Sequence, residues 1–460
     1  MDIQVYNTMS KRVENFKPLK EKEVGIFTCG PTVYWYAHIG NLRAYVFADI
    51  LKRMFMYNGY KVKHVMNITD VGHLISDSDT GEDKMEKAKE REGKSAWDIA
   101  KFYEKAFFED TKKLNIIKPE VVARATEEID AQIELIKKIE ENGYTYQIED
   151  GVYFDTSKLK DYGKLINLDV TKLKAGARVE MVEGKKNPTD FALWKFSPKD
   201  KKRDMEWDSP WGIGFPGWHI ECSAMSMKYL GETFDVHTGG IDHIPIHHTN
   251  EIAQSVAANG VEPVKYWLHN EFLIEKDGKM SKSEGKILVL SVLLEKGYSA
   301  IDYRYLLLTS SYRKQLFFTW EGLNSAKNTM EKLRKIVLEI KSEEGKVNEV
   351  YKKEFNSAIN DDLNTPVGLA VMWKMLKDEN LNNEDKYQTL LDFDKVLGLE
   401  LDKIEEEKVE VPEDIKILIS KRDEARKNKN WELSDKIREE IKSKGFIVED
   451  TKEGTKVIKK

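Results

Sequence analysis

Val24-Gly25-Ile26-Phe27-Thr28 runs directly into Cys29-Gly30-Pro31-Thr32, and His38-Ile39-Gly40-Asn41 follows shortly afterwards. The first five residues are typical of a short buried strand, and the Gly-Pro pair predicts a turn. Beyond Asn41, apolar residues recur at helical spacing. The segment therefore predicts a strand, a loop and a helix, with His38 and Asn41 at the helix entrance.

A helix entrance of this kind is suited to phosphate. The first N–H groups of a helix lack partners within the helix, and its dipole favours negative charge there. Gly40 allows a nucleotide to approach the backbone closely. An ordinary strand-to-helix turn with a capping Asn41 would have the same local pattern, so the segment needs a second motif to support a nucleotide site.

The second motif is Lys279-Met280-Ser281-Lys282-Ser283, which lies between Gly278 and Gly285. Lysine is a compact point charge on a long stem and suits polyphosphate. A solvated lysine turn is the alternative in a chain with 74 Lys and Arg residues. The presence of both motifs in this order favours the nucleotide interpretation.

Both segments resemble class I aminoacyl-tRNA synthetases. The pentapeptide resembles the KMSKS motif, and His38–Asn41 resembles the HIGH motif with Asn in place of its final His. The resemblance implies ATP with Mg²⁺ as substrate and catalytic roles for Lys279, Lys282, His38 and Asn41. It further implies that His38, Gly40, Asn41 and Lys282 bind ATP.

Composition sets the limits of this interpretation. The chain has 460 residues, of which 40% are hydrophobic and 33% charged, as in a globular protein of several domains. No apolar run is long enough to span a bilayer, and no signal peptide is evident at Met1, so we expect a cytoplasmic protein.

The net charge of −6 does not by itself indicate a nucleic-acid partner. Residues 412–460 carry 14 basic and 11 acidic residues, or +3, which leaves −9 for the remainder.

A possible metal site is discontinuous in sequence. Cys29 and Cys222 are the only cysteines, and all nine histidines lie between His38 and His269. His247 and Glu251 are four residues apart and share one face if the segment is helical. Two thiolates, an imidazole and a carboxylate form a typical Zn²⁺ set. From residue types alone, two buried free cysteines and a His-Glu surface pair are the favoured explanation.

A more specific resemblance covers nearly the whole chain. The stretch Cys29–Tyr34, the block Gly217-Trp218-His219-Ile220-Glu221-Cys222-Ser223-Ala224-Met225 and the His247–Glu251 segment are similar to the cysteinyl-tRNA synthetase family. The resemblance implies one zinc held by Cys29, Cys222, His247 and Glu251 and a cysteine pocket lined by Cys29, Thr69, Trp218 and His237. His219, His243 and His248 are then structural residues rather than ligands. The implied reaction is ATP-dependent activation of L-cysteine and transfer to the 3′ end of tRNA(Cys).

The corresponding fold class is α/β. We expect a Rossmann-like parallel sheet with an insertion domain, then a helical bundle and a small α+β anticodon-binding tail, in a monomer. The expected organisation is residues 1–118 for the first catalytic half, 119–204 for the insertion (connective) domain, 205–270 for the second half, 271–320 for a stem-contact region with the lysine loop, 321–400 for the bundle, 401–411 for a linker and 412–460 for the tail.

Several features leave alternatives open. Trp431 lies among basic residues of the tail and fits either a stacking platform for an anticodon base or a core tryptophan. The acidic stretch Ser76–Asp83 and the residues Glu284 and Lys286 depart from the family pattern. A related cysteine ligase acting on an aminosugar would share the N-terminal half but lack the tail, and a non-catalytic zinc-bound sensor or tRNA-binding protein would not need Lys279 and Lys282.

Overall fold

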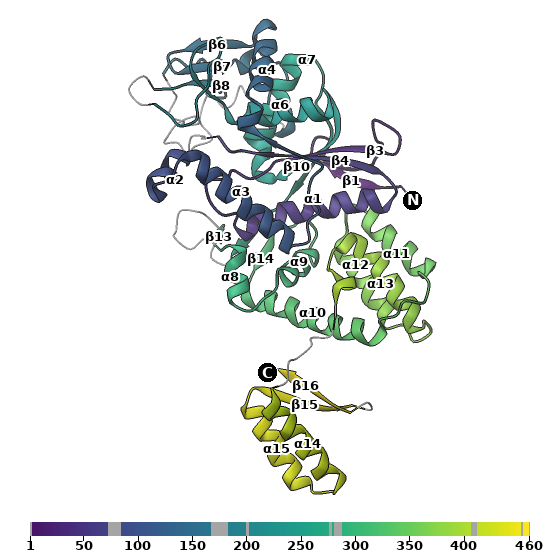
Figure 1. Ribbon diagram of the computed structural model, residues 1–460. Helices are drawn as coiled ribbons and strands as arrows, with labels where there is room; N and C mark the ends of the chain where they lie inside the picture. The colour runs from purple at the N-terminus through teal and green to yellow at the C-terminus, as the bar shows by residue number, and fades with distance from the viewer. Residues whose placement is uncertain are drawn as a thin grey trace. The chain divides into compact units, whose positions relative to one another are not determined.

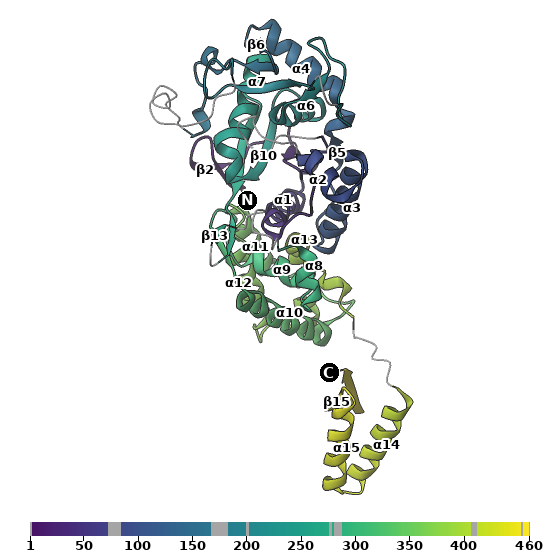
Figure 2. The same cartoon turned by 90° about the vertical axis from the view of Figure 1, so that its left-hand side faces the viewer.

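The computed structural model describes residues 2–71, 84–166, 183–198, 202–275, 278–279, 288–405, 412–451 and 454–459. The chain divides into two compact units, Met1–Asp402 and Lys403–Lys460. Figures 1 and 2 show the elements of each unit in two views. No helix within these ranges is long and apolar enough to cross a membrane.

The centre of the first unit is a parallel sheet of five strands in the order β11-β10-β3-β4-β5. The strands are β3 (Glu23–Thr28), β4 (Lys61–Ile68), β5 (Val121–Arg124), β10 (Phe234–Gly240) and β11 (Val264–Asn270). The chain builds outward from β3 through β4 and β5 and then returns to the other side of β3 with β10. This reversal places a topological switch point between β3 and β10, where open α/β sheets bind ligands at the strand carboxyl ends.

Helices cover both faces of this sheet. Helix α1 (Ile39–Tyr57) packs on β3, β4 and β10, while α6 (Trp218–Leu230) packs on β3 and β4 from the opposite side (Figure 1). Phe27, Val65 and Trp267 are fully buried in the core between them. The strand, turn and helix predicted at residues 24–54 are therefore confirmed. The remaining helices of this region are α2 (Lys84–Glu92), α3 (Ala96–Lys113) and α7 (Thr249–Asn259), and the strands β1 (Gln4–Asn7) and β2 (Arg12–Asn15) form a hairpin.

The insertion carries an antiparallel sheet of four strands in the order β6-β7-β8-β9, with helix α4 (Ile129–Glu141) before it. The strands are β6 (Thr145–Ile148), β7 (Gly151–Phe154), β8 (Phe191–Phe196) and β9 (Gly214–Pro216). The predicted hairpin around Glu149-Asp150-Gly151 is confirmed, with Gln147 opposite Val152.

Two strands pair across the expected limits 119–204 of the insertion. Strand β5 lies within them but pairs with β4 in the parallel sheet, where Val65 faces Val121. Strand β9 lies beyond them but pairs with β8, where Trp194 faces Pro216. Both strands are short, and their sheet membership depends on partners distant in sequence, so local patterns could not assign them.

A small sheet and a helical region complete the first unit. The sheet has the order β13-β12-β14, formed by β12 (Leu273–Glu275), β13 (Gly278–Lys279) and β14 (Leu316–Phe318). The helices are α8 (Leu290–Glu295), α9 (Ala300–Leu308), α10 (Trp320–Ile340), α11 (Glu349–Asn360), α12 (Thr365–Leu376) and α13 (Asn383–Leu397). Pro366 lies in the first turn of α12, behind the N-cap Asn364, as the sequence predicts.

The second unit is a helical hairpin with a two-stranded sheet. Helices α14 (Glu413–Lys427) and α15 (Trp431–Ser443) are followed by β15 (Phe446–Thr451) and β16 (Gly454–Lys459), with Val448 opposite Val457. Its small core contains Ile415, Ile437 and Ile441. The two helices and the hairpin predicted for the tail are confirmed.

Short helical turns connect these elements. They are η1 (Ala125–Glu127), η2 (Thr156–Lys158), η3 (Lys164–Ile166), η4 (Ile241–His243), η6 (Leu401–Lys403) and a π-helical turn, η5 (Ile244–His248). The turns η4 and η5 follow β10 directly and bring the chain across the carboxyl end of the sheet into α7, and π-helical turns are often found at functional sites.

Candidate functional site

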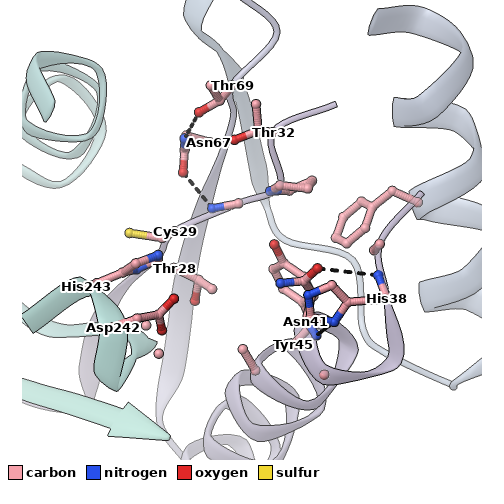
Figure 3. Close-up of a pocket in the computed structure, with 18 of the residues that line it drawn as sticks. Thr28, Cys29, Thr32, His38, Asn41, Tyr45, Asn67, Thr69, Asp242 and His243 are labelled. Carbon is pink, nitrogen blue, oxygen red and sulfur yellow. Dashed lines mark hydrogen bonds between the residues drawn. The ribbon is translucent and has the colours of Figure 1, made fainter. Parts of the chain in front are cut away.

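A cavity of about 240 Å³ lies at the carboxyl ends of β3 and β10. Its lining includes the turn after β3, the entrance of α1, the end of β4, the start of α6 and the turns η4 and η5. Figure 3 shows Cys29 and His243 toward one end of this cavity and His38 with Asn41 at the other. The cavity therefore occupies the switch point and joins the predicted metal residues to the predicted phosphate site.

The entrance of α1 is closed by a reciprocal capping box. The backbone N–H of Asn41 donates to His38 Nδ1 at 3.1 Å, and the N–H of His38 donates to Asn41 Oδ1 at 3.3 Å. Because Asn41 uses its oxygen in the cap, its amide nitrogen is the group available to donate to an anion. Asn41 is thus both a capping residue and a lining residue of the cavity, so the two interpretations of this segment are compatible.

A polar network beneath the turn was not identified from the sequence. The N–H of Gly30 donates to Asn67 Oδ1 at 2.7 Å, Asn67 Nδ2 donates to Thr69 Oγ1 at 3.1 Å (Figure 3), and Thr69 donates to Glu221 Oε2 at 2.9 Å. A Cβ on Gly30 would lie 1.6 Å from the carbonyl oxygen of Asn67. Only glycine fits this approach, and the network fixes Thr69 on the cavity wall.

The four predicted metal ligands lie together. Cys29 follows β3, Cys222 is on α6, His247 is in η5 and Glu251 is on α7. One ligand atom from each lies within 4.8 Å of the others, and all four residues are buried. His247 Nε2 and Glu251 Oε1 are 3.0 Å apart. The two side chains therefore point at one another inside the cluster, an arrangement that fits two ligands of one cation.

The electrostatics of this cluster also fit a cation. Burial raises the pKa of Cys29 and raises that of Cys222 well above its ordinary value. Burial alone would lower the pKa of His247, but the neighbouring Cys222 and Glu251 raise it. Two buried thiols beside a carboxylate become thiolates only when positive charge is present, and metal binding supplies it. The residues therefore fit zinc by donor type, burial and charge.

A second set of residues satisfies the same distance criterion. It combines Cys29 and Glu251 with His237 and His248. His237 Nε2 lies 2.9 Å from Glu251 Oε2, and His248 Nε2 lies 3.3 Å from Cys29 Sγ. His248 is also bonded through Nδ1 to His269 Nε2 at 2.7 Å. Hydrogen bonds from outer residues fix ligand orientation in metal sites, and the contacts of His237 with Glu251 and of His248 with Cys29 have this form.

His237, predicted to line the cysteine pocket, lies behind the wall of this cavity. His237 is fully buried, stacks on Trp267 with ring centroids 4.7 Å apart, and is not a lining residue of the cavity. The wall at this position is formed by His243 and Asp242 (Figure 3), which the sequence did not single out for it.

Trp218 does line the cavity, as predicted. Its ring centroid lies 4.6 Å from that of His247, with the rings tilted by 32°. His219, the next residue, is buried and places its Nδ1 2.9 Å from His247 Nδ1. The pair therefore fixes the orientation of the His247 ring from two sides, and His219 takes the structural position expected of it.

The lysine loop lies mostly outside the described residues, including Lys282, Glu284 and Lys286, as does the acidic stretch Ser76–Asp83. The backbone of Lys279 is described. It lies in β13, where Lys279 pairs with Ile274 of β12. The adjoining chain re-enters at Leu288, whose carbonyl accepts the N–H of Ile39, the first residue of α1, at 2.9 Å.

In the second unit, Trp431 is 57% exposed. It does not belong to the buried cluster of that unit, and the Arg426 guanidinium carbon lies 5.9 Å from its ring centroid. The alternative of a core tryptophan is therefore excluded.

Comparisons with known proteins agree with this geometry. The family model described as "tRNA synthetases class I (C) catalytic domain" matches residues 15–328, and the "DALR domain" model matches residues 354–402. The fold and the site are thus those of a class I aminoacyl-tRNA synthetase. Cysteine--tRNA ligase 1 of Burkholderia lata is 49% identical over 459 residues and covers 100% of this chain and 97% of its own. Cysteine--tRNA ligase of Treponema denticola is 47% identical over 484 residues, with 98% of each chain covered. The chain belongs to the cysteine--tRNA ligase family.

Solved structures of other members of the class share the fold. Methionyl-tRNA synthetase of Mycobacterium tuberculosis in complex with methionyl-adenylate has a TM-score of 0.57 at 14% identity, covering 82% of this chain and 90% of its own. The LeuRS–tRNA–LeuAMS ternary complex from Agrobacterium radiobacter K84 has a TM-score of 0.59 at 12% identity, covering 84% of each chain. These similarities support the α/β fold class predicted from the sequence.

Proposed function

We propose that this chain activates L-cysteine with ATP and transfers the cysteinyl group to the 3′ end of tRNA(Cys). The observation that carries the proposal is a single cavity with two chemically different ends. Cys29, Cys222 and His247 of the zinc-type cluster line one end, and the capped entrance of α1 with His38 and Asn41 lines the other. This arrangement suits a thiol-bearing amino acid whose carboxylate faces the α-phosphate of ATP.

The cysteine end would be built on zinc. Cys29, Cys222, His247 and Glu251 would hold the ion, which when bound supplies a soft Lewis acid for the thiolate of cysteine. An apolar pocket distinguishes near-isosteres by only a few kcal/mol, whereas serine offers a hydroxyl that such a site binds poorly. Thr69 and Trp218 shape the same end of the cavity.

The nucleotide end relies on cations and N–H donors. In nucleotidyl transfer, charge develops on the phosphate oxygens, so the main contribution of the protein is positioned positive charge and hydrogen-bond donors. We assign phosphate binding to His38, Asn41 and the N–H groups at the start of α1, with Gly40 allowing close approach. Lys279 and Lys282 are the cations that stabilise the transition state, with Mg²⁺ accompanying ATP.

The C-terminal parts would bind tRNA. The helical region that matches the DALR description and the second unit follow the catalytic region in sequence. In the second unit, the exposed ring of Trp431 beside Arg426 offers a stacking surface for an unpaired anticodon base. We expect one chain to act as a monomer.

Amino-acid-dependent exchange between ATP and pyrophosphate tests the first step, and charging of tRNA(Cys) tests the second. Cysteine should support exchange and serine should not. Exchange with serine or methionine instead of cysteine would refute the assignment, and cysteine-dependent exchange without tRNA charging would favour the aminosugar ligase.

The zinc assignment has its own measurement. Cys222→Ser should lower the zinc content from one ion per chain and weaken cysteine binding in parallel. Ser223→Ala is the matched control, because Ser223 is the next residue of α6 and its hydroxyl bonds to Gln254 rather than to a ligand. Equal zinc content in both variants would remove Cys222 from the ligand set.

A further inference from the structure

Arg43 lies on α1 two residues beyond Asn41 and is buried, with 3% of its surface exposed. Its guanidinium donates to backbone carbonyls of two separate segments. Nη1 donates to the carbonyl of Phe272, and Nη2 donates to the carbonyl of Lys314 at 2.6 Å and of Ser311 at 3.3 Å. A planar group with several N–H donors can satisfy acceptors on two segments at once, which the single nitrogen of lysine cannot do.

These segments support the strand that carries Lys279. Phe272 immediately precedes β12, and its carbonyl also accepts the N–H of Leu316, the first residue of β14, at 3.1 Å. Strand β12 pairs with β14 on one side and with β13 on the other, where Ile274 faces Lys279. A continuous series of hydrogen bonds therefore runs from Arg43 through β12 to the backbone of Lys279.

The same end of α1 holds the chain where it returns at Leu288. Besides the bond between Ile39 N–H and the Leu288 carbonyl, His38 forms an antiparallel bridge with Val289. The hydroxyl of Tyr303 donates to the Ile39 carbonyl at 2.8 Å. The first turns of α1 thus hold both the segment that enters β12 and the segment that leaves toward α8.

We propose that Arg43 is a positioning residue for adenylate formation. By fixing β12 and β14 against α1, it sets where Lys279 stands relative to the phosphate donors His38 and Asn41. The role rests on the proposed function and adds to it a residue that touches neither substrate. Since the catalysis proposed here depends on where charges are placed, a displacement of about 1 Å can cost about 100-fold in rate.

The test is Arg43→Lys in the full-length, zinc-loaded chain. We expect kcat for cysteine-dependent ATP–pyrophosphate exchange to fall by about 100-fold, while zinc content and KM for cysteine stay unchanged. Arg43→Gln, which keeps amide donors without the charge, is the second variant if the first folds poorly. The kcat is expressed per folded, zinc-loaded chain, so that unfolded protein in a destabilised variant does not lower it.

Arg53→Lys is the matched control. Arg53 is on the same helix and equally engaged with carbonyls, donating to Lys395 at 3.1 Å and to Asn115 at 2.7 Å, but it lies nearly three turns beyond Arg43. It also bonds to Asp49. We expect the control to lose stability and to keep kcat. Equal losses of kcat in the Arg43 and Arg53 variants would overturn the proposal.

A double variant tests whether Arg43 acts through Lys279. If it does, Arg43→Lys combined with Lys279→Ala should be no slower than Lys279→Ala alone. A loss equal to the product of the two single losses would overturn the proposal. An unsubstituted chain without cysteine-dependent exchange would instead refute the proposed function, so the two failures are distinguishable.

Discussion

His64 provides a test of how the centre of the sheet responds to pH. It lies on β4, is 2% exposed, and bonds through Nε2 to Thr28 Oγ1 at 2.9 Å. Its Nδ1 has no hydrogen-bond partner among the described residues. Burial, reinforced by the nearby charge of Lys52, lowers the pKa of His64 to about 3. The imidazole is therefore neutral in the folded protein throughout the range in which an unfolded histidine becomes protonated.

The direction and size of the effect follow from this shift. An unfolded histidine has a pKa of about 6.5, so below that pH the unfolded state binds a proton that the folded state does not. Stability therefore falls as pH is lowered from about 6.5 toward about 3. On going from pH 7 to pH 5, proton uptake by His64 in the unfolded state should lower the free energy of unfolding by about 2 kcal/mol, which is equivalent to about 1.4 pKa units.

The perturbation that isolates this contribution is His64→Leu. At pH 7 the variant should be less stable by about 1 kcal/mol, the worth of one hydrogen bond, because the Thr28 hydroxyl keeps its bond to Thr238 at 2.8 Å. At pH 5 the difference in the free energy of unfolding between the two proteins should disappear or change sign. Leucine, unlike His64, binds no proton in the unfolded chain. All other titrating groups cancel in the difference between the two proteins.

The assay is urea unfolding followed by tryptophan fluorescence at pH 7 and pH 5, at equal zinc loading. Trp431 is the only tryptophan of the second unit, so the signal reports chiefly on the first unit. A stability difference between the two proteins that stays constant from pH 7 to pH 5 would refute the reasoning. It would mean that His64 gains its proton in the folded sheet as readily as in the unfolded chain.

The other predictions concern the turn, the metal and the second unit. Gly30→Ala should destabilise the first unit by about 3 kcal/mol or more, because its Cβ would lie 1.6 Å from the Asn67 carbonyl oxygen; a soluble variant with the parental melting temperature would contradict this. Removal of zinc by a chelator should make both cysteines reactive toward a thiol reagent, and re-addition of zinc should protect them; constant reactivity would count against the site. Arg422→Ala should destabilise the second unit by about 2 kcal/mol, because the buried guanidinium forms two bonds to Asp450 at 2.9 and 2.8 Å, while ATP–pyrophosphate exchange stays unchanged. Trp431→Ala should raise KM for tRNA without changing exchange, whereas Trp431→Phe should largely restore it; an effect on exchange would argue against a role confined to tRNA.

Local sequence patterns were sufficient for the elements that precede and follow the site. The apolar run ending at Thr28 and the helical spacing beyond Asn41 each depend on residues close in the chain, and both elements form as predicted. The tail was predicted for the same reason, because Asn428–Asn430 separates two helical patterns and the hairpin lies at its end. The sheets to which β5 and β9 belong could not be predicted in this way, because their partner strands are distant in sequence.

The site was predictable in part. The residue types were compatible with a zinc site. The four candidate ligands have no recognisable spacing in the sequence, however, so only the resemblance to a family selected them. The network from Gly30 through Asn67 and Thr69 to Glu221 has no local pattern, because it links β3, β4 and α6. The packing of His237 could not be read from the sequence for a similar reason: a residue on a central strand can face either layer, and here its ring stacks on Trp267.

The switch point explains why the two ends of the cavity belong together. Cys29 follows β3 and His38 caps α1, so one connection would carry both a metal ligand and the phosphate-binding entrance. The other three ligands follow the insertion and reach the site only because β10 pairs with β3, where His237 faces Phe27. On the proposed function, recognition of the thiol would require both halves of the sheet to be assembled, while the phosphate entrance belongs to the first half alone. A substrate that fills both ends is bound by contacts that no single half could provide, which ties the choice of amino acid to the integrity of the catalytic fold.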